Sequence, residues 1–230
     1  MAVLFFDIQT IPSQDEKVAA AIAESVKPPA NYTQAETIAR WYREHFQAEL
    51  DKRYRQTALD GLYGEICSIA WAFDDGEITV FCRDEQSGEP GLLQHFMQEL
   101  REPNWDGRHL CVDKWVGHFI SGFDLRFLWQ RCVVNRVRPV LPLPLDARLW
   151  DERVFDTQQI WSGGQASGHS KLAALAQGLQ LSASTGAGVD GANVYEYWLA
   201  GRYQDIAAYN RQAVSWAREL YKRFLFLTDS

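Results

Sequence analysis

The sequence has no long hydrophobic run and no excess of positive charge. No apolar run approaches the roughly 20 residues that a helix needs to span a bilayer, so we expect no membrane segment. The N-terminal MAVLFFDIQT has neither a basic leader nor a small-residue cleavage site, so we expect no signal peptide. The net charge of −7 argues against a protein that coats nucleic acid non-specifically. An enzyme that meets nucleic acid at one local cleft remains compatible with that charge.

The sequence is also poor in cysteine and has no CxxC motif. Its four cysteines are scattered, and each lies in an apolar stretch: Cys67, Cys82, Cys111 and Cys132. This pattern predicts buried free thiols rather than disulfides or a zinc site. We therefore expect a protein of the reducing cytoplasm.

The remaining patterns are those of a single globular domain of 230 residues that carries an insertion. Apolar runs predict strands at 2–8, 64–73, 77–83, 109–119 and 154–161. Helical periodicity predicts helices at 91–102, 123–137, 170–181, 194–201 and 205–227, and a helical insertion at 14–60. This order indicates an α/β fold of the ribonuclease H-like kind, with a mixed sheet flanked by helices and a helical insertion after the first strand.

The tryptophans favour packing roles over base stacking. Trp129, Trp198 and Trp216 fall at apolar helix positions, so we expect them in the core. Trp41 lies in the insertion, in the stretch ARWYREHF, and is the best candidate for an exposed aromatic residue.

Three short stretches carry the candidate chemistry. FFDIQTIP is an apolar strand that runs into Asp7, with Gln9 two residues later. GHFISGFDLRFL places Asp124 at the start of a helix, directly after a strand. YNRQAV places Tyr209 and Ala213 on one face of the last helix, because residues four apart are neighbours there.

In these stretches the chain resembles the tyrosine subtype (DEDDy) of the DEDD 3′–5′ exonuclease superfamily, especially stand-alone exonucleases similar to the proofreading domain of family B DNA polymerases. The resemblance runs from residue 3 to about residue 224 and leaves out the insertion. The family's motifs are Asp-x-Glu, Asn-x-x-x-(Phe/Tyr)-Asp and Tyr-x-x-x-Asp. They stand here as Asp7-Ile8-Gln9, Phe119 to Phe123-Asp124, and Tyr209 to Ala213.

The resemblance implies two divalent ions, Mg²⁺ or Mn²⁺, held on four carboxylates, which clamp the scissile phosphate and activate the attacking water. It assigns catalytic roles to Asp7, Asp124 and Tyr209, and metal binding to Asp7 and Asp124. It also implies nucleic-acid contacts by Thr10, His118 and Phe123, although the strand-end position of His118 favours a structural role.

Three motif positions depart from the family. Gln9 replaces the glutamate with a neutral amide, Ala213 replaces the last aspartate with a methyl group, and Phe119 replaces the asparagine. Two of four negative charges are therefore missing, and we expect weak or absent binding of Mg²⁺ or Mn²⁺.

We considered three nearby acids as replacements for the missing ligands. Asp205 lies two helical turns, about 12 Å, from Ala213, too far to fill the same position. Asp113 and Asp156 could serve only if their loops bring them inward.

Three functions follow as hypotheses. The first is a degenerate exonuclease-fold protein that binds a single-stranded 3′ end or a protein partner with little or no cleavage. The second is an active Mg²⁺- or Mn²⁺-dependent 3′–5′ exonuclease that uses Asp7, Asp124 and Tyr209. The third is a protein-interaction module of a larger complex, favoured by the acidic balance and the helical insertion.

Overall fold

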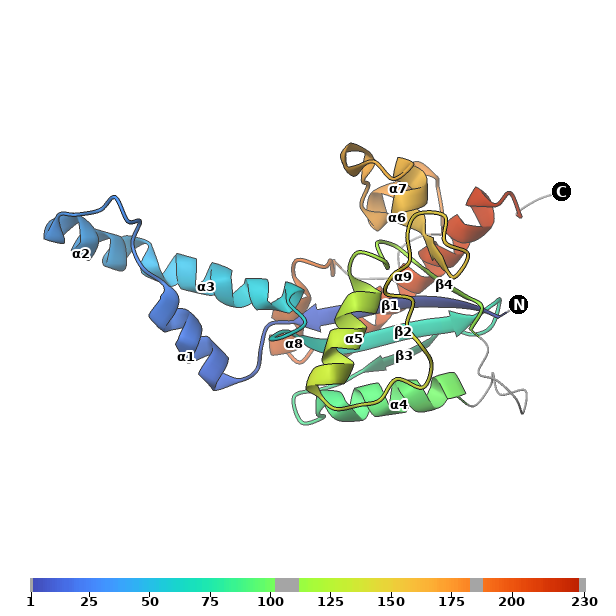
Figure 1. Cartoon of the computed structure of the whole chain (residues 1–230), viewed down its shortest axis with the longest axis horizontal. Coiled ribbons are helices and arrows are strands. Elements are labelled where there is room, and N and C mark those ends of the chain that lie inside the picture. Colours follow the sequence, from blue (N-terminus) through green and yellow to red (C-terminus); the bar gives the residue numbers. More distant parts are fainter. Residues whose placement is uncertain (1, 102–111, 183–187, 228–230) are drawn as a thin grey trace. The chain divides into compact units, whose positions relative to one another are not determined.

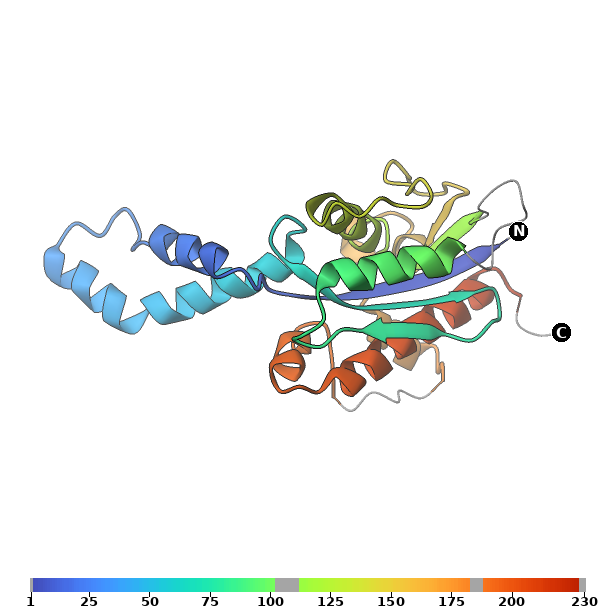
Figure 2. The ribbon, with the colours of Figure 1, turned by 90° about the horizontal axis from the view of Figure 1, so that it is seen from below.

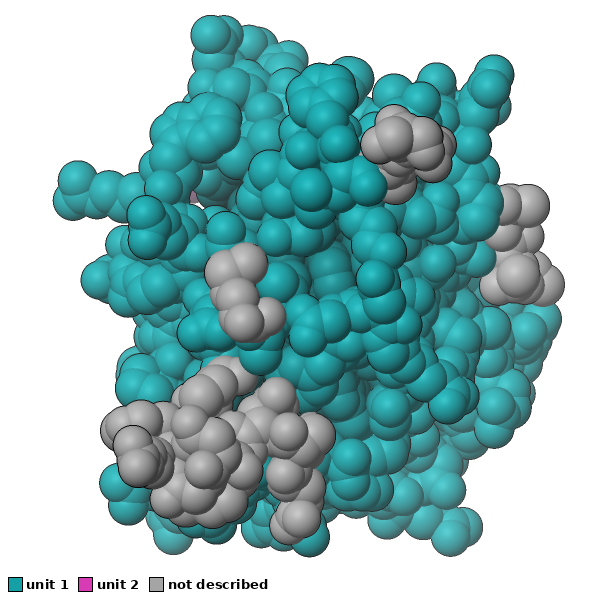
Figure 3. All heavy atoms as spheres, turned by 90° about the vertical axis from the view of Figure 1, so that its right-hand side faces the viewer, with its two compact units in different colours: residues 1–9, 66–230 teal, residues 10–65 magenta. Residues whose placement is uncertain are grey.

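A computed structural model describes residues 2–101, 112–182 and 188–227. The chain divides into two compact units, which we call unit 1 (residues 1–9 and 66–230) and unit 2 (residues 10–65). Figure 3 shows one face of unit 1 in space-filling form. Among the described residues, no helix combines the length and the apolar character needed to cross a membrane.

Unit 1 is built on a mixed sheet of five strands in the order β3-β2-β1-β4-β5 (Figure 1). The strands are β1 (Val3–Ile11), β2 (Glu65–Phe73), β3 (Thr79–Cys82), β4 (Lys114–Gly117) and β5 (Val154–Asp156). β4 pairs in parallel with both β1 and β5, and β2 pairs antiparallel with β3. The register Phe5↔Val116 puts the carboxyl ends of β1 and β4 at the same edge of the sheet.

The two faces of the sheet are covered by different helices (Figure 2). Leu4, Phe6 and Ile8 of β1 pack in the core cluster of α4 (Glu89–Arg101) and α5 (Asp124–Val134). Val3 and Phe5 pack on the other face, in the cluster that contains Val214 and Tyr221 of α9 (Tyr203–Phe224). Because side chains alternate along a strand, the odd positions of β1 that follow point to the face of α9.

Most of the expected elements of unit 1 are present, with one error. The expected strand at 154–161 is β5, of three residues, followed by helix α6 (Thr157–Ser162). The side chain of Asp156 accepts hydrogen bonds from the backbone N–H groups of Gln158 and Gln159, and this cap begins the helix. The remaining elements are η2 (Ala166–Gly168), α7 (Leu172–Gly178) and α8 (Val194–Leu199).

The expected strand at 109–119 corresponds to β4, and its first residues, 109–111, lie outside the described residues. The Gly-rich stretch at 184–192, whose composition predicts a loop, lies partly outside them as well.

The observed burial of the cysteines and tryptophans agrees in part with expectation. Cys67 and Cys132 are buried free thiols and Cys82 is half-buried, whereas Cys111 lies outside the described residues. Trp198 and Trp216 are buried as expected. The expectation for Trp129 was wrong, because its side chain is 43% exposed on the outer face of α5.

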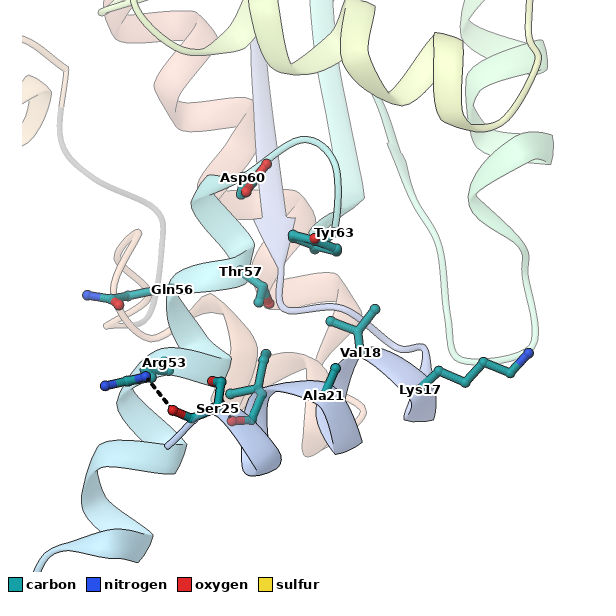
Figure 4. Close-up of a pocket in the computed structure, with 10 residues that line it drawn as sticks. Lys17, Val18, Ala21, Ser25, Arg53, Gln56, Thr57, Asp60 and Tyr63 are labelled. Atoms are coloured by element: carbon teal, nitrogen blue, oxygen red, sulfur yellow. Dashed lines mark hydrogen bonds between the residues drawn. The ribbon is translucent and has the colours of Figure 1, made fainter. Parts of the chain in front are cut away.

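Unit 2 contains helices α1 (Glu16–Ser25), α2 (Ala35–Glu44) and α3 (Phe46–Gln56), followed by η1 (Thr57–Leu59). Trp41 is buried at 8% exposure against Tyr42 and His45, so the expectation of an exposed aromatic was wrong. A groove of about 490 Å³ lies between α1 and α3, where Arg53 donates a hydrogen bond to the carbonyl of Ser25 at 3.4 Å (Figure 4).

Candidate functional site

Two carboxyl groups lie close together just beyond the carboxyl end of β4, beside the middle of β1. Asp7 is at an odd position of β1, and Asp124 is the first residue of α5, which follows β4. The backbone N–H of Ile8 donates a hydrogen bond to Oδ1 of Asp124 at 3.0 Å, which ties the Asp124 side chain to β1 beside Asp7. Asp124 is only 5% exposed. The structure therefore brings together the aspartates of the first two motifs, and we call them the carboxylate pair.

The protein environment disfavours full ionisation of the carboxylate pair. Burial raises the pKa of Asp7 to about 7, against the opposing effect of a hydrogen bond from Gln9. Burial and the neighbouring charge of Asp7 raise the pKa of Asp124 well above its usual range. The pair therefore carries less than two full negative charges at neutral pH.

Gln9 fills the second position of the first motif in a specific way. Its Nε2 donates a hydrogen bond to Oδ2 of Asp7 at 2.7 Å, and its side chain is buried. A carboxylate in this place would repel Asp7 unless a cation lay between them. The amide instead donates to Asp7 and engages one of the oxygens that could bind a cation.

The third motif lies on α9. Burial, then the charges of Asp7 and Asp190, raise the pKa of Tyr209 to about 12, while the backbone N–H of Gly191 donates to its phenol oxygen. Tyr209 therefore lies within electrostatic reach of Asp7. Ala213 follows one turn later, is buried at 5% exposure and adds only a methyl group.

Sequence reasoning missed Asp190. Its Oδ1 accepts hydrogen bonds from the backbone N–H groups of Ala192 and Asn193, so the side chain closes a tight turn before α8. The available signal was the turn-forming run Asp190-Gly191-Ala192-Asn193, which sequence reasoning interpreted only as part of a Gly-rich loop.

Phe119 occupies the loop between β4 and α5 in an unusual backbone conformation. Its φ angle is +62°, in the left-handed region, and its side chain is 39% exposed. The ring lies against Gly122: a Cβ at Gly122 would come within 2.2 Å of a ring carbon of Phe119. The loop thus presents an aromatic ring at the surface where the family has an asparagine.

Asp156 holds this loop in place rather than serving as a spare ligand. Its Oδ1 accepts from the N–H of Phe119 at 2.9 Å, and its Oδ2 accepts from the N–H of Ser121 at 3.1 Å. Oδ1 also accepts from the first turn of α6. The carboxylate is buried, and its charge contributes to the raised pKa of Asp124.

The other two acids considered are engaged elsewhere. Asp113 accepts a hydrogen bond from the backbone N–H of Ala2 at 2.6 Å. Asp205 forms an ion pair with Arg202 at 2.8 Å. Neither Asp113 nor Asp205 therefore supplies the carboxylate that is missing at Ala213.

The residues expected to contact nucleic acid lie in three different settings. His118 has both ring nitrogens engaged: Nε2 donates to the carbonyl of Ser170 at 2.8 Å, and Nδ1 lies 3.0 Å from Oγ1 of Thr157. Burial lowers the pKa of His118, which favours the neutral ring. Phe123 packs against the core and lies 5.1 Å from the ring of Phe127.

Thr10 belongs to unit 2, where its hydroxyl donates to the carbonyl of Ala58 at 2.8 Å. Contacts of Thr10, His118 and Phe123 with nucleic acid stay predictions.

Comparison with solved structures identifies the fold. The family B DNA polymerase from the hyperthermophilic archaeon Pyrobaculum calidifontis is similar over 98% of this chain, with a TM-score of 0.61 and 17% sequence identity. The chain has a ribonuclease H-like fold. It spans about a quarter of the polymerase, 24% of that chain. No protein-family model and no curated protein sequence matches the chain.

The ribonuclease H-like fold and the resemblance imply divalent ions, and the donor set does not fit two of them. Within residues 2–101, 112–182 and 188–227, no group of three or more His, Cys, Asp or Glu side chains lies close enough to hold a metal ion. Two carboxyl groups and one amide that donates to Asp7 are far from the charged oxygen set that two divalent ions require.

Proposed function

We propose that the chain is a degenerate member of the tyrosine subtype of the DEDD exonucleases, which binds a single-stranded 3′ end with little or no cleavage. The hydrogen bond from Gln9 to Asp7 carries this proposal. It occupies one oxygen of Asp7 without a cation, whereas an exonuclease of this type uses such oxygens to hold its ions. The fold similarity to a DNA polymerase supports nucleic acid as the ligand class.

The surroundings of the pair support binding over cleavage. Ala213 removes a further charge, so that with Gln9 only two carboxylates stand where the family has four, too few to hold two divalent ions. The exposed ring of Phe119 offers a face on which a terminal base can stack.

The alternative of an active exonuclease rests on the same pair. Asp124 and Tyr209 each lie within electrostatic reach of Asp7, as the causes of their pKa shifts indicate. A single ion on the two aspartates would be the minimum for this activity, and the cleavage assay below separates the two hypotheses.

The test is cleavage of an end-labelled 3′-overhang oligonucleotide in Mg²⁺ and in Mn²⁺. We expect no turnover by the unmodified chain, and cleavage after the double restoration Gln9→Glu with Ala213→Asp. Asp7→Ala in the restored background is the control and should abolish cleavage. Rapid turnover by the unmodified chain that disappears in Asp7→Ala would overturn the proposal.

Binding is measured separately, in EDTA, with a linear single strand and with a circular strand of the same sequence. Preference for a 3′ end predicts tighter binding of the linear strand, and Phe119→Ala should remove that preference. Equal affinity for both strands would exclude recognition of the end.

A further inference from the structure

Unit 1 carries a cluster of positive side chains outside the candidate site. α4 and the segment that follows α5 line a cavity of about 440 Å³, and its lining includes Arg101, Arg136 and Arg138 together with Gln94 and Gln98. We call the three arginines the arginine cluster. In the described part of the chain, no Asp or Glu side chain lines this cavity.

The arginine cluster is not neutralised by neighbouring acids that the structure describes. All three side chains are exposed, and the ion pairs formed among the described residues do not include them. The chain as a whole has 23 basic and 30 acidic residues, so this positive charge is local. A concave surface lined by one sign of charge concentrates counter-ions, and planar guanidinium groups suit phosphate oxygens.

The backbone of Arg136 decides which substitution tests its side chain. Arg136 follows the C-cap of α5 with a φ angle of +55°, a position where glycine or asparagine is favoured. The N–H of Arg136 donates to the carbonyl of Val133 at 3.2 Å, and that of Val137 donates to the carbonyl of Cys132 at 2.9 Å. An arginine therefore occupies a helix end where glycine is favoured, as Gln180 and Phe226 do after α7 and α9, so replacing Arg136 with glycine should not strain the backbone.

The position of the cluster relates it to the candidate site. α5 begins at Asp124 and ends at Val134, and its eleven residues span about 16 Å. Arg136 and Arg138 follow the end of α5 that is remote from Asp124. The guanidinium groups come from two separate segments, which suits a polyanion with several phosphates better than one small anion.

We propose that Arg101, Arg136 and Arg138 bind the backbone phosphates of a single-stranded nucleic acid at a site separate from the carboxylate pair. Gln94 and Gln98 line the same cavity and supply amide donors beside the phosphates.

The test uses fluorescence anisotropy with a labelled circular single strand, in EDTA, over a range of salt concentrations. Arg101→Gln, Arg136→Gly and Arg138→Gln should each weaken binding about three- to tenfold and reduce the salt slope by roughly 0.7. Arg126→Gln is the matched control, because Arg126 is an exposed arginine of α5 that does not line the cavity. It should leave both quantities unchanged.

Arg136→Gly separates binding from folding. It removes the side chain and relieves the left-handed backbone, so the melting temperature should stay the same or rise while affinity falls. A parallel loss of melting temperature and affinity would show that Arg136 acts through the fold, and would overturn its assignment as a ligand.

Three further outcomes would overturn the proposal. One is unchanged affinity and salt slope in the triple variant, and another is absence of binding to the circle. The third is a higher affinity of the unmodified chain for inorganic pyrophosphate or for anionic lipid vesicles than for the single strand. Because a circular strand has no 3′ end, the result does not depend on the end binding proposed above.

Discussion

Asp7→Asn tests the electrostatic account of the carboxylate pair through the pH dependence of stability. Burial raises the pKa of Asp7 in the folded state from 3.8 to about 7. The unfolded chain therefore loses this proton near pH 4, whereas the folded chain keeps it until about pH 7. The stability that Asp7 contributes is present below pH 4 and is lost as the pH rises toward 7. Asparagine cannot ionise, so the variant does not show this loss.

The expected magnitude follows from the same pKa values. The rise from 3.8 to about 7 corresponds to about 4 kcal/mol in the free energy of unfolding, at about 1.4 kcal/mol per pH unit. Asp7 keeps partial solvent access, which reduces this figure, and we expect Asp7→Asn to be about 2 kcal/mol more stable than the unmodified chain at pH 8. At pH 4 the two proteins should differ little.

The assay is urea unfolding, followed by tryptophan fluorescence, at pH 4, 6 and 8 in EDTA. Asp205→Asn is the control, since its exposed ion pair with Arg202 should change stability by less than about 1 kcal/mol at any of these pH values. Equal stability of Asp7→Asn and the unmodified chain at pH 8 would refute the reasoning. So would a stabilisation of the same size at pH 4 and pH 8.

Three other predictions concern the same region. In scanning fluorimetry, millimolar Mg²⁺ should raise the melting temperature of the Gln9→Glu, Ala213→Asp double variant and leave that of the unmodified chain unchanged. An equal rise in both proteins would contradict the inference that Gln9 and Ala213 weaken metal binding. Phe119→Asn should leave the free energy of unfolding unchanged or raise it by up to about 1 kcal/mol in urea unfolding, because asparagine tolerates a φ of +62°. A clear loss of stability would show that the contacts of the phenylalanine ring stabilise the fold more than its left-handed backbone destabilises it. Asp156→Ala should lower the free energy of unfolding by roughly 2–4 kcal/mol, because several partly buried N–H groups lose their acceptor. Asp156→Asn should recover part of this loss, and an unchanged unfolding midpoint in Asp156→Ala would contradict the anchoring role.

The main layers of unit 1 could be predicted because they follow from local patterns. β1 alternates between two core clusters, and the turn between β2 and β3 follows from Asp74, Asp75 and Gly76. The short helix α6 was missed because the apolar residues on both sides of Asp156 are typical of a single strand. Only the capping hydrogen bonds of Asp156 distinguish the two structures.

The meeting of Asp7 and Asp124 could also be expected from topology, since β1 and β4 are parallel neighbours and the helix that Asp124 begins follows β4. The sequence could not predict the orientation of the Gln9 amide or the left-handed backbone at Phe119. Phe119 is anchored by Asp156, 37 residues later in the chain, and a contact of that kind leaves no periodic signal. Trp41 was misjudged for a similar reason: helical spacing places a residue on a face and does not say what packs against it.

The departures from the family motifs are accompanied by local contacts that fit them. Gln9 donates to Asp7, where a glutamate would repel it. Phe119 lies over Gly122, and any larger residue at Gly122 would clash with its ring. Ala213 is buried within the packing of α9. The raised pKa of Asp7 reflects its burial, and the hydrogen bond from Gln9 offsets part of that effect. Restoring both acids is a sharper test of the proposed function than removing Asp7, because it returns the two missing charges and leaves the rest of the site as it is.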